Sequence, residues 1–405
     1  MEKRLQALWW DGSVVGHLVH RGTIYFVYDE AWIKRGHNLS PLSLPFTDVA
    51  FNGSRGIDGL PGLIADCLPD SWGRKVARQE FAKNKWGEPN SMSLLAWRGM
   101  RGVGALHFVP PLQEGPGEYR LDSISAAALA RGAAEIQRGE PTEVLAQLAK
   151  GGTAGGAYPK ALVLAYADGT LRVGPPDGVG DPCLLKLDVS AGGESAASEH
   201  AYARMARSAG IRSVETRLIE KKGSSKRRHL LIRRFDLPDL KQSERRAHFH
   251  SASGLLHKSP GELDYRDLFR AAIRLNVPPQ ELRELARRMV FNVLASNHDD
   301  HGKNHAFLYD EERREWTLTP AYDVTFDLGM LERAMLVSGE VWPTAAIMEA
   351  LCLDAGLAKD EFQIILKEVT AALKKWPTFA KQAHLSAAKT NEIRERHRLI
   401  QSRII

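Results

Sequence analysis

The sequence predicts an α+β fold of two lobes, with an N-terminal β-rich subdomain and a helical C-terminal lobe. Three observations favour it. Residues 1 to about 112 begin with strands and turns and end at Pro110-Pro111, short apolar strands follow in the middle of the chain, and apolar residues then recur at helical spacing. A chain of 405 residues with 43% hydrophobic residues can bury a core for two or three packed lobes.

Several segments outside the central strands are expected to be helical from their composition and spacing. They are Leu60 to Trp86, Ser123 to Arg138, Glu143 to Lys150, and the stretch after Asp360 with the apolar stripe Phe362, Ile365, Leu366, Val369 and Leu373. Such a stripe indicates a packed bundle core, and Pro377 is expected to break this helix.

A glycine-rich segment runs from Gly151 to Lys160, and an apolar strand, Ala161 to Tyr166, follows it. Glycines let backbone amides approach a phosphate closely, and the lysine adds a positive charge. A Walker A loop opens a helix at this point, so the strand argues against that class and against a dinucleotide-binding fold. The segment fits a flap over nucleotide phosphates, and a flexible linker is the alternative.

A short buried strand is predicted at Pro182 to Leu187, and Lys186 is its one cation. A lysine on such a strand clamps nucleotide phosphates in protein kinases. Glu199 follows thirteen residues later in a predicted helix, Glu194 to Ala209, which Gly210 closes as a left-handed cap. A strand lysine and a helix glutamate form the ion pair that positions phosphates. The alternatives are a lysine that reaches water from an edge strand and a solvated helix charge.

His229 to Asp236 is predicted to be a strand, in the place where a kinase joins its two lobes. There the backbone of Arg233, Arg234 and Phe235 can hydrogen-bond the edge of an adenine, which any residue type can do. The alternative is an amphipathic strand with a structural pair of arginines.

The most informative segment is the polar run from Asn297 to Asn304. Asp299 and Asn304 have the D-x-x-x-x-N spacing of a kinase catalytic loop, in which the carboxylate accepts a hydroxyl proton and the amide oxygen holds Mg²⁺. Asp323, further on, can supply a second metal carboxylate. The run follows a predicted buried helix, Glu281 to Ser296, which would aim it.

Two alternatives stay open for this polar run. It can be a solvated turn, or it can belong to a metal-dependent hydrolase, because five side chains in and beside it are competent ligands: His298, Asp299, Asp300, His301 and His305. A kinase is favoured because the other parts of such a site occur upstream, in the order that a kinase needs.

Taken together, these segments resemble the HipA family of serine/threonine kinases, the toxin components of bacterial toxin-antitoxin pairs. Segments near the start are similar to that family's small N-terminal subdomain: Val15-Gly16-His17-Leu18, Tyr28 to Trp32, Pro41 to Pro45, and Leu68-Pro69-Asp70-Ser71. The resemblance implies a protein-kinase-like fold with the N-terminal subdomain at 1–112, the kinase N-lobe at 113–236 and the helical C-lobe at 237–405. Asp300 and Arg233 depart from the founding toxin, which has a glycine and a glutamate there.

Matched position by position, the resemblance makes Asp299 the catalytic aspartate and places Asn304 and Asp323 on Mg²⁺. Glu199 would form the supporting ion pair. Thr153 aligns with a serine whose phosphorylation ejects the phosphate loop, so it is the expected autophosphorylation site. The expected ATP contacts are Gly155, Gly156, Ala157, Tyr158, Pro159, Lys160, Lys186, Arg233, Arg234, Phe235, His301, Gly302, Lys303, Asn304 and Tyr322.

The resemblance also implies a function and partners. It implies ATP- and Mg²⁺-dependent phosphorylation of a cytoplasmic protein, with aminoacyl-tRNA synthetases among the family's targets, and hence growth arrest and persistence. The expected partner is a HipB-like helix-turn-helix antitoxin, with DNA contacted only through it. The alternative is a non-catalytic co-repressor that binds the antitoxin and acts on its operator.

Composition agrees with this interpretation. The 55 basic and 49 acidic residues give a net charge of +6, too small to establish nucleic-acid binding. The cysteines Cys67, Cys183 and Cys352 are an odd number without metal spacing, which favours a reducing cytoplasm. The N-terminal apolar run stops too early for a signal peptide, and we expect no membrane helix.

Overall fold

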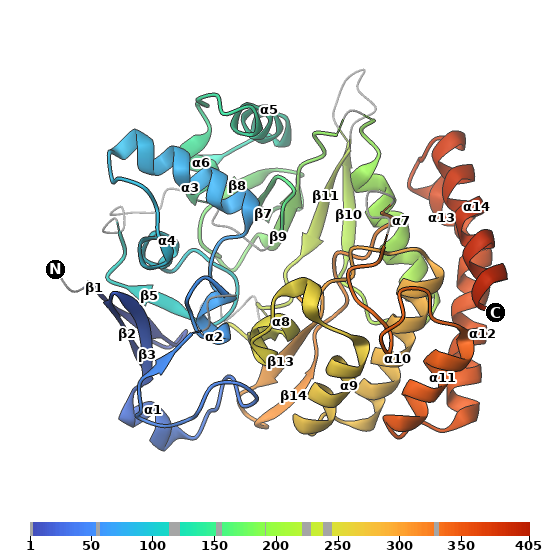
Figure 1. Ribbon diagram of the computed structural model, residues 1–405. Helices are drawn as coiled ribbons and strands as arrows, with labels where there is room; N and C mark the ends of the chain where they lie inside the picture. Colours follow the sequence, from blue (N-terminus) through green and yellow to red (C-terminus); the bar gives the residue numbers. More distant parts are fainter. Residues whose placement is uncertain are drawn as a thin grey trace. The chain divides into compact units, whose positions relative to one another are not determined.

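The computed structural model describes residues 3–53, 57–112, 122–150, 156–190, 192–220, 228–237, 245–327 and 332–405. The chain divides into two compact units (Figure 1). The first comprises Met1–Gly193 and Ile219–Phe249, and the second comprises Glu194–Leu218 and His250–Ile405.

The first unit begins with a five-stranded antiparallel sheet in the order β4-β3-β2-β1-β5. Its strands are β1 (Lys3–Leu8), β2 (Val14–Arg21), β3 (Thr23–Tyr28), β4 (Phe51–Asn52) and β5 (His107–Val109). The helices of this region are α1 (Glu30–Arg35), α2 (Gly62–Ala65), α3 (Ser71–Asn84) and α4 (Ser91–Arg98). The helical segment expected at Leu60 to Trp86 is therefore two helices, because Pro69 disfavours helical backbone at the residue before it.

A second sheet of six strands follows, in the order β10-β11-β9-β7-β8-β6. Its strands are β6 (Asp122–Ser123), β7 (Lys160–Ala165), β8 (Leu171–Val173), β9 (Asp181–Lys186), β10 (Thr216–Glu220) and β11 (Arg228–Arg233). Every residue of β7 is buried, as its apolar sequence predicts. The expected helices before it are α5 (Ala126–Gln137) and α6 (Leu145–Lys150). The strand predicted up to Asp236 ends at Arg233, where the chain bends.

The second unit is mainly helical. Its helices are α7 (Ser195–Ser208), α8 (Ala252–Leu256), α9 (Tyr265–Arg274), α10 (Pro279–Leu294), α11 (Ala345–Asp354), α12 (Lys359–Lys374), α13 (Trp376–Gln382) and α14 (Ala387–Ile404), with a short 3₁₀ helix, η2, at Pro260–Glu262. The predicted helix from Glu194 to Ala209 is confirmed as α7, and Gly210 has the left-handed φ of +82°. The region expected to be helical also contains a small sheet in the order β12-β13-β14 (His248–Ser251, Ala306–Asp310 and Glu315–Leu318).

Helix α12 carries the predicted apolar stripe, and four of its five members are buried: Phe362, Ile365, Val369 and Leu373. The helix ends at Lys374, before the proline. Pro377 lies in the first turn of α13, where its missing N–H costs no helical hydrogen bond. The expected break is therefore real, but the proline starts the next helix.

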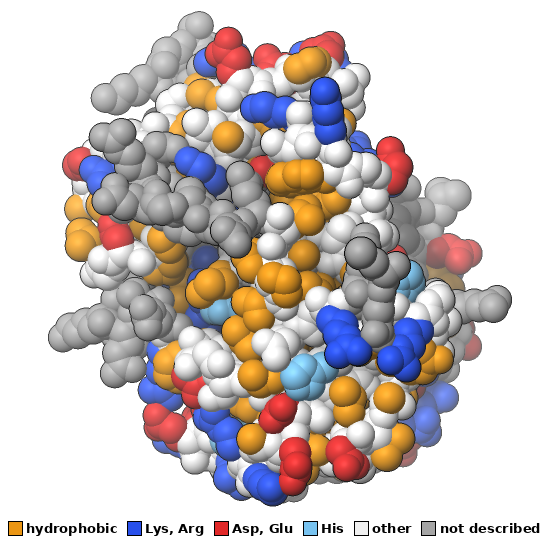
Figure 2. All heavy atoms as spheres, turned by 90° about the vertical axis from the view of Figure 1, so that its left-hand side faces the viewer, with side chains coloured by type: hydrophobic (Ala, Val, Ile, Leu, Met, Phe, Trp, Pro, Cys, Tyr) orange, Lys and Arg blue, Asp and Glu red, His pale blue; other side chains and the backbone are white. Residues whose placement is uncertain are grey.

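Two surface properties bear on function. On the face drawn in Figure 2, Lys and Arg side chains occur among Asp and Glu side chains, in agreement with the small net charge of +6. Among the residues that the structure describes, no helix is both long and apolar enough to span a bilayer.

Candidate functional site

The loop that follows α10 is folded into a tight turn by its own hydrogen bonds. The Asn304 backbone N–H donates to the His301 carbonyl at 2.8 Å. The Asn304 side-chain Nδ2 donates to the Asp299 carbonyl at 2.7 Å. Because the amide nitrogen is anchored in this way, Oδ1 is the acceptor that the side chain can offer to a cation.

Two adjacent aspartates in this loop have opposite environments. The Asp299 side chain is 39% exposed, and its Oδ1 lies 3.8 Å from Nε2 of His301. Burial raises the pKa of Asp299, as do the carboxylates of Asp327, Asp323 and Asp300, while His301 opposes the shift. A cluster of negative charge of this kind favours a cation nearby. Asp300, in contrast, is 1% exposed and ion-paired.

Asp300 belongs to a buried polar cluster beneath the loop. Its Oδ2 accepts from the Tyr265 hydroxyl at 2.8 Å and from Nη2 of Arg333 at 3.2 Å. The Tyr265 hydroxyl in turn accepts from Asn292 of α10 at 2.9 Å, and Asn292 accepts from Asn297 at 3.0 Å. The cluster therefore fixes the loop to α9 through Tyr265 and to α10 through Asn292.

Two residues that were expected to contact ATP have structural contacts here. Gly302 is packed so closely that an added Cβ would lie 2.1 Å from Cδ1 of Leu263, so a larger residue would require that side chain to move. The Tyr322 hydroxyl donates to the Lys303 carbonyl at 2.7 Å, which joins the Tyr322 segment to the loop. His301 and Lys303 are half-buried in the loop itself.

Asp323 follows that segment with a φ of +54°. This left-handed conformation is uncommon outside glycine, although aspartate and asparagine adopt it more readily than other residues. The side chain is half-buried, and its charge is one of those that raise the pKa of Asp299. The two carboxylates are thus electrostatically coupled, as a metal ligand and a catalytic base would be.

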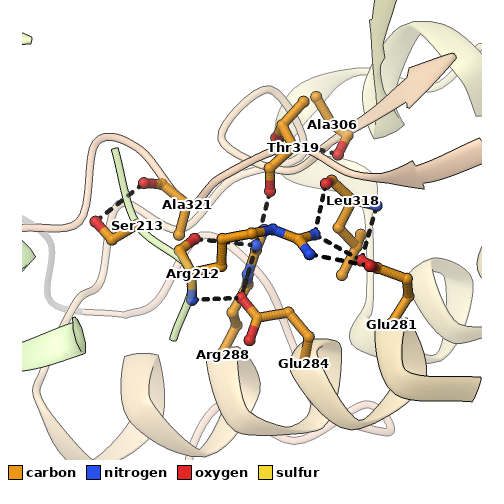
Figure 3. A network of polar contacts seen from close by, with 9 residues as sticks. All are labelled: Arg212, Ser213, Glu281, Glu284, Arg288, Ala306, Leu318, Thr319 and Ala321. Carbon is orange, nitrogen blue, oxygen red and sulfur yellow. Dashed lines mark hydrogen bonds and ion pairs between the residues drawn. The ribbon is translucent and has the colours of Figure 1, made fainter. Parts of the chain in front are cut away.

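Helix α10 holds the chain just before Asp323 through two ion pairs (Figure 3). In the first, Arg212 binds both carboxylate oxygens of Glu281 at 3.0 and 2.7 Å. The same guanidinium donates to the Leu318 carbonyl at 2.7 Å, and Glu281 accepts from the Leu318 N–H at 3.0 Å. The end of β14 is therefore tied to α10 through both the N–H and the carbonyl of Leu318.

The second ion pair, Arg288 with Glu284, is buried and lies one turn further along α10 (Figure 3). Arg288 also donates to the Thr319 carbonyl at 2.7 Å, and the Ala321 N–H donates to the Arg212 carbonyl at 2.7 Å. Sequence reasoning missed this clamp. The available signal was the charge of Glu281, Glu284 and Arg288 on a helix predicted to be buried.

The hydrolase alternative needs ligands that the structure uses elsewhere. His298 is buried and packs edge-on against Trp342 with ring centroids 5.6 Å apart. His305 is buried against Tyr265, and burial together with Arg288 and His301 lowers its pKa to about 3. Asp300 is paired with Arg333. Among the described residues, no three His, Cys, Asp or Glu side chains are arranged to hold a metal ion.

A small cavity lies beside Asn304. It is lined by Ile211, Arg288, Asn292, Asn297, Asp300, Asn304, His305, Ala321, Tyr322 and Val324. The cavity therefore brings together Ile211, α10 with the loop that follows it, and the Tyr322 segment.

In the first unit, two lysines lie directly opposite each other on neighbouring strands. Lys160 of β7 pairs with Lys186 of β9, and they are 2% and 9% exposed. Residues opposite each other in a sheet share a face, and like charges in this position are unfavourable. Both lysines are therefore expected on one face of the sheet, where a phosphate group would reduce their mutual repulsion.

The other residues of the glycine-rich segment are only partly described. Gly155 and Thr153 lie outside the described residues. Gly156 donates its N–H to Oδ2 of Asp70 at 2.5 Å. Ala157 and Tyr158 are exposed, whereas the Pro159 carbonyl accepts from the Leu187 N–H at 2.8 Å.

Glu199 is half-buried on α7, which belongs to the second unit. The ion pair expected between this glutamate and Lys186 of the first unit stays a prediction.

The end of β11 shows what the side chain and N–H of Arg234 bind. Its N–H donates to the Pro182 carbonyl at 3.0 Å, and its guanidinium binds the buried Asp236 through Nε at 2.9 Å and Nη2 at 2.6 Å. The side chain of Arg234 is thus structural, as in the alternative considered for this strand. Arg233 is exposed, and Phe235 packs against Phe249 with ring centroids 5.2 Å apart. The adenine contact expected from the backbone of Arg233, Arg234 and Phe235 stays a prediction.

Comparison with known proteins gives the family. The model of the HipA N-terminal domain matches residues 6–109, and that of the HipA-like C-terminal domain matches residues 152–376, more than half of the chain. The chain belongs to the HipA family. A Sinorhizobium fredii protein named “Putative kinase Y4mE” is 27% identical in an alignment of 403 positions that covers 95% of this chain and 86% of that protein.

A solved HipA structure supports the fold. HipA of Shewanella oneidensis MR-1, solved in complex with HipB and operator DNA, has a TM-score of 0.71 at 18% identity and covers 99% of this chain and 96% of its own. The predicted α+β, protein-kinase-like fold is therefore confirmed.

Proposed function

We propose that this HipA-family chain is an ATP- and Mg²⁺-dependent serine/threonine kinase that phosphorylates a protein. The observation that supports it most is the turn joining Asp299 and Asn304, in which the asparagine nitrogen is anchored and its oxygen is left to face a cation. The negative charge of Asp323 and the clamp that holds its segment add to this support.

Each group has a role in the proposed transfer. Asp299 accepts the proton of a serine or threonine hydroxyl of the substrate. The hydroxyl oxygen bonds to the γ-phosphorus of ATP, the bond from that phosphorus to the β-phosphate oxygen breaks, and ADP leaves. Asn304 and Asp323 would hold Mg²⁺, which neutralises charge on the phosphate oxygens when bound. Lys160 and Lys186 would attract the phosphates, and Thr153 would be the site of autophosphorylation.

The proposal extends to partners and organisation. The HipA of S. oneidensis was solved with HipB and operator DNA, so we propose a HipB-like antitoxin for this chain, with DNA contacted through it. The substrate would be a cytoplasmic protein, with aminoacyl-tRNA synthetases as candidates from the family resemblance. The subdomains would be 1–112, 113–236 and 237–405. A non-catalytic co-repressor is the second candidate, since the operator complex is known for that relative.

Incubation of the purified chain with labelled ATP and Mg²⁺ tests the proposal, with Asp299→Asn as the matched control. We expect label on the wild-type chain or on an added protein extract, and almost none with the control. Absence of transfer by folded wild-type protein, together with tight antitoxin and operator binding, would favour the co-repressor.

A further inference from the structure

The first turn of α3 touches the glycine-rich segment at two points. Oδ2 of Asp70 accepts from the Gly156 N–H at 2.5 Å. The indole of Trp72 donates to the Lys160 carbonyl at 2.8 Å, and both of these residues are almost fully buried. Asp70 and Trp72 thus bind the two ends of Gly156–Lys160, the described part of the glycine-rich segment, although they lie 86 and 88 positions earlier in the sequence.

Asp70 has an unusual position for a residue with this contact. It is the N-cap of α3 and has extended backbone angles, φ −76° and ψ −171°, yet its side chain makes no capping hydrogen bond. An aspartate at an N-cap ordinarily accepts from an N–H of the first helical turn. Here the carboxylate binds Gly156 instead, which connects the start of the helix to the loop.

Helix α3 also holds the element that precedes the glycine-rich segment. Helix α6, which ends at Lys150, packs against α3, and Figure 1 shows the two helices near each other. Gln79 of α3 donates to the Glu140 carbonyl at 2.8 Å, in the turn between α5 and α6. The glycine-rich segment therefore begins after α6, which packs against α3, and ends at the start of β7, which Trp72 of α3 binds.

We propose that Asp70 and Trp72 are positioning residues for nucleotide binding, an inference that rests on the proposed function. A glycine-rich chain has many conformations, and its amides bind a phosphate well only if they are arranged beforehand. The two hydrogen bonds restrict the segment at Gly156 and fix the start of β7 beside its lysine pair. The family's N-terminal part, which carries none of the catalytic residues, would then contribute to ATP affinity.

One other mechanism would use the same contact. The Asp70 carboxylate is an anion on an amide that we expect to face a phosphate, so it could compete with ATP for that N–H. The Trp72 contact favours positioning, because a neutral indole on a strand carbonyl does not compete with a phosphate. Substitutions at residue 70 separate the two mechanisms.

The test compares Asp70→Ala, Asp70→Asn and Trp72→Phe by calorimetry with Mg-ATP and by steady-state phosphorylation. We expect Asp70→Ala and Trp72→Phe to weaken ATP binding roughly fivefold to tenfold, the size of one lost hydrogen bond. Asp70→Asn should stay within about twofold, because its amide oxygen still accepts from Gly156. The KM for ATP should rise in the first two variants while kcat changes little.

Asp58→Asn is the matched control, because Asp58 pairs with Arg74 of the same helix at 2.8 Å and is half-exposed. It should leave the KM for ATP unchanged. If Trp72→Phe does not fold, as judged by thermal unfolding, the two Asp70 variants decide. Tighter ATP binding by both Asp70 variants, or unchanged ATP binding by Asp70→Ala, overturns this inference and leaves the proposed function untouched. A folded wild-type chain that binds no Mg-ATP overturns the proposed function and this inference with it.

Discussion

The residues proposed to bind ATP phosphates and those proposed to transfer phosphate are held in different ways in the two units. In the second unit, buried ion pairs fix the loop of Asp299 and the segment of Asp323: Asp300 with Arg333, Glu284 with Arg288, and the partly exposed Arg212 with Glu281. In the first unit, the glycine-rich segment is held by hydrogen bonds to its backbone. Charged side chains that are fixed before ligand arrives serve the chemical step, whereas a glycine-rich segment can adjust to a nucleotide. Changes in the second unit should therefore lower kcat, and changes in the first should alter ATP affinity.

The largest effect is expected for Asp299→Asn. The amide keeps the shape of the side chain but cannot accept the hydroxyl proton, a contribution of about 10²- to 10⁴-fold in rate. Single-turnover phosphate transfer measures it, and calorimetry should find Mg-ATP binding retained. Transfer at a near wild-type rate would remove Asp299 from its role.

Asp323→Asn and Asn304→Ala should come next, through the metal. Asn304→Ala removes an oxygen ligand, whereas Asp323→Asn keeps one amide oxygen but removes the negative charge. The Mg²⁺ concentration for half-maximal activity should therefore rise roughly 10- to 100-fold, the range found when groups supporting a metal site are lost. Asparagine is used at 323 because it tolerates the positive φ. An unchanged Mg²⁺ requirement in both variants would contradict the assignment.

Arg333→Met breaks the buried pair beneath the loop. It leaves the Asp300 carboxylate uncompensated, so we expect a loss of about 3–5 kcal/mol in unfolding free energy and a lower kcat with little change in ATP affinity. The double variant Asp300→Leu, Arg333→Met should recover much of the stability but not kcat. Arg313→Met is the control, because its pair with Asp310 is exposed. If Arg333→Met and Arg313→Met lose the same unfolding free energy, the burial of the Asp300–Arg333 pair does not contribute to its effect on stability.

Lys186→Ala tests the first unit. Loss of one of two opposed lysines should weaken ATP binding about tenfold, the size of a charge-assisted hydrogen bond, with a smaller change in kcat. Calorimetry with ATP and with adenosine separates the phosphate contribution, since adenosine binding should be unaffected. If Lys186→Ala lowers kcat more than it weakens ATP binding, the first unit does not act mainly on ATP affinity, and the proposed difference between the two units is wrong.

Thr153→Ala should have the smallest effect on initial rate. If Thr153 is the autoregulatory site, its phosphate adds about −1.5 to −2 charges near bound ATP, so the variant should keep its activity during long incubation while the wild type loses it. Mass spectrometry beside an Asp299→Ala control checks the modification. Phosphate at Thr153 with undiminished ATP binding would exclude the switch.

The sequence predicted the parts of the fold that depend on local pattern. The strand predicted at Ala161–Tyr166 is found one residue earlier as β7, Lys160–Ala165, and the helix predicted at Glu194–Ala209 is found as α7. The roles assigned to the loop after α10 rest on residue spacing and stay predictions. The early end of β11 was missed, because the bend depends on the contacts of Arg234 with Asp236 and with the sheet partner Pro182.

The missed contacts join residues far apart in the chain. Arg212 and Glu281 are 69 positions apart, and Trp72 and Lys160 are 88 apart. No period in a single sequence pairs such residues, since their contact is created by the packing of whole helices and strands. Charged residues on a helix predicted to be buried were the local sign that partners must exist.

The backbone at Asp323 has a consequence for how such genes change over time. At a φ of +54°, glycine and asparagine are the replacements that the chain accepts most easily. Both are one nucleotide change away from aspartate codons, and both remove the carboxylate. With the proposed role of Asp323, a harmful kinase can be weakened in a single mutational step without unfolding, and the surviving protein keeps the surface that binds its partner.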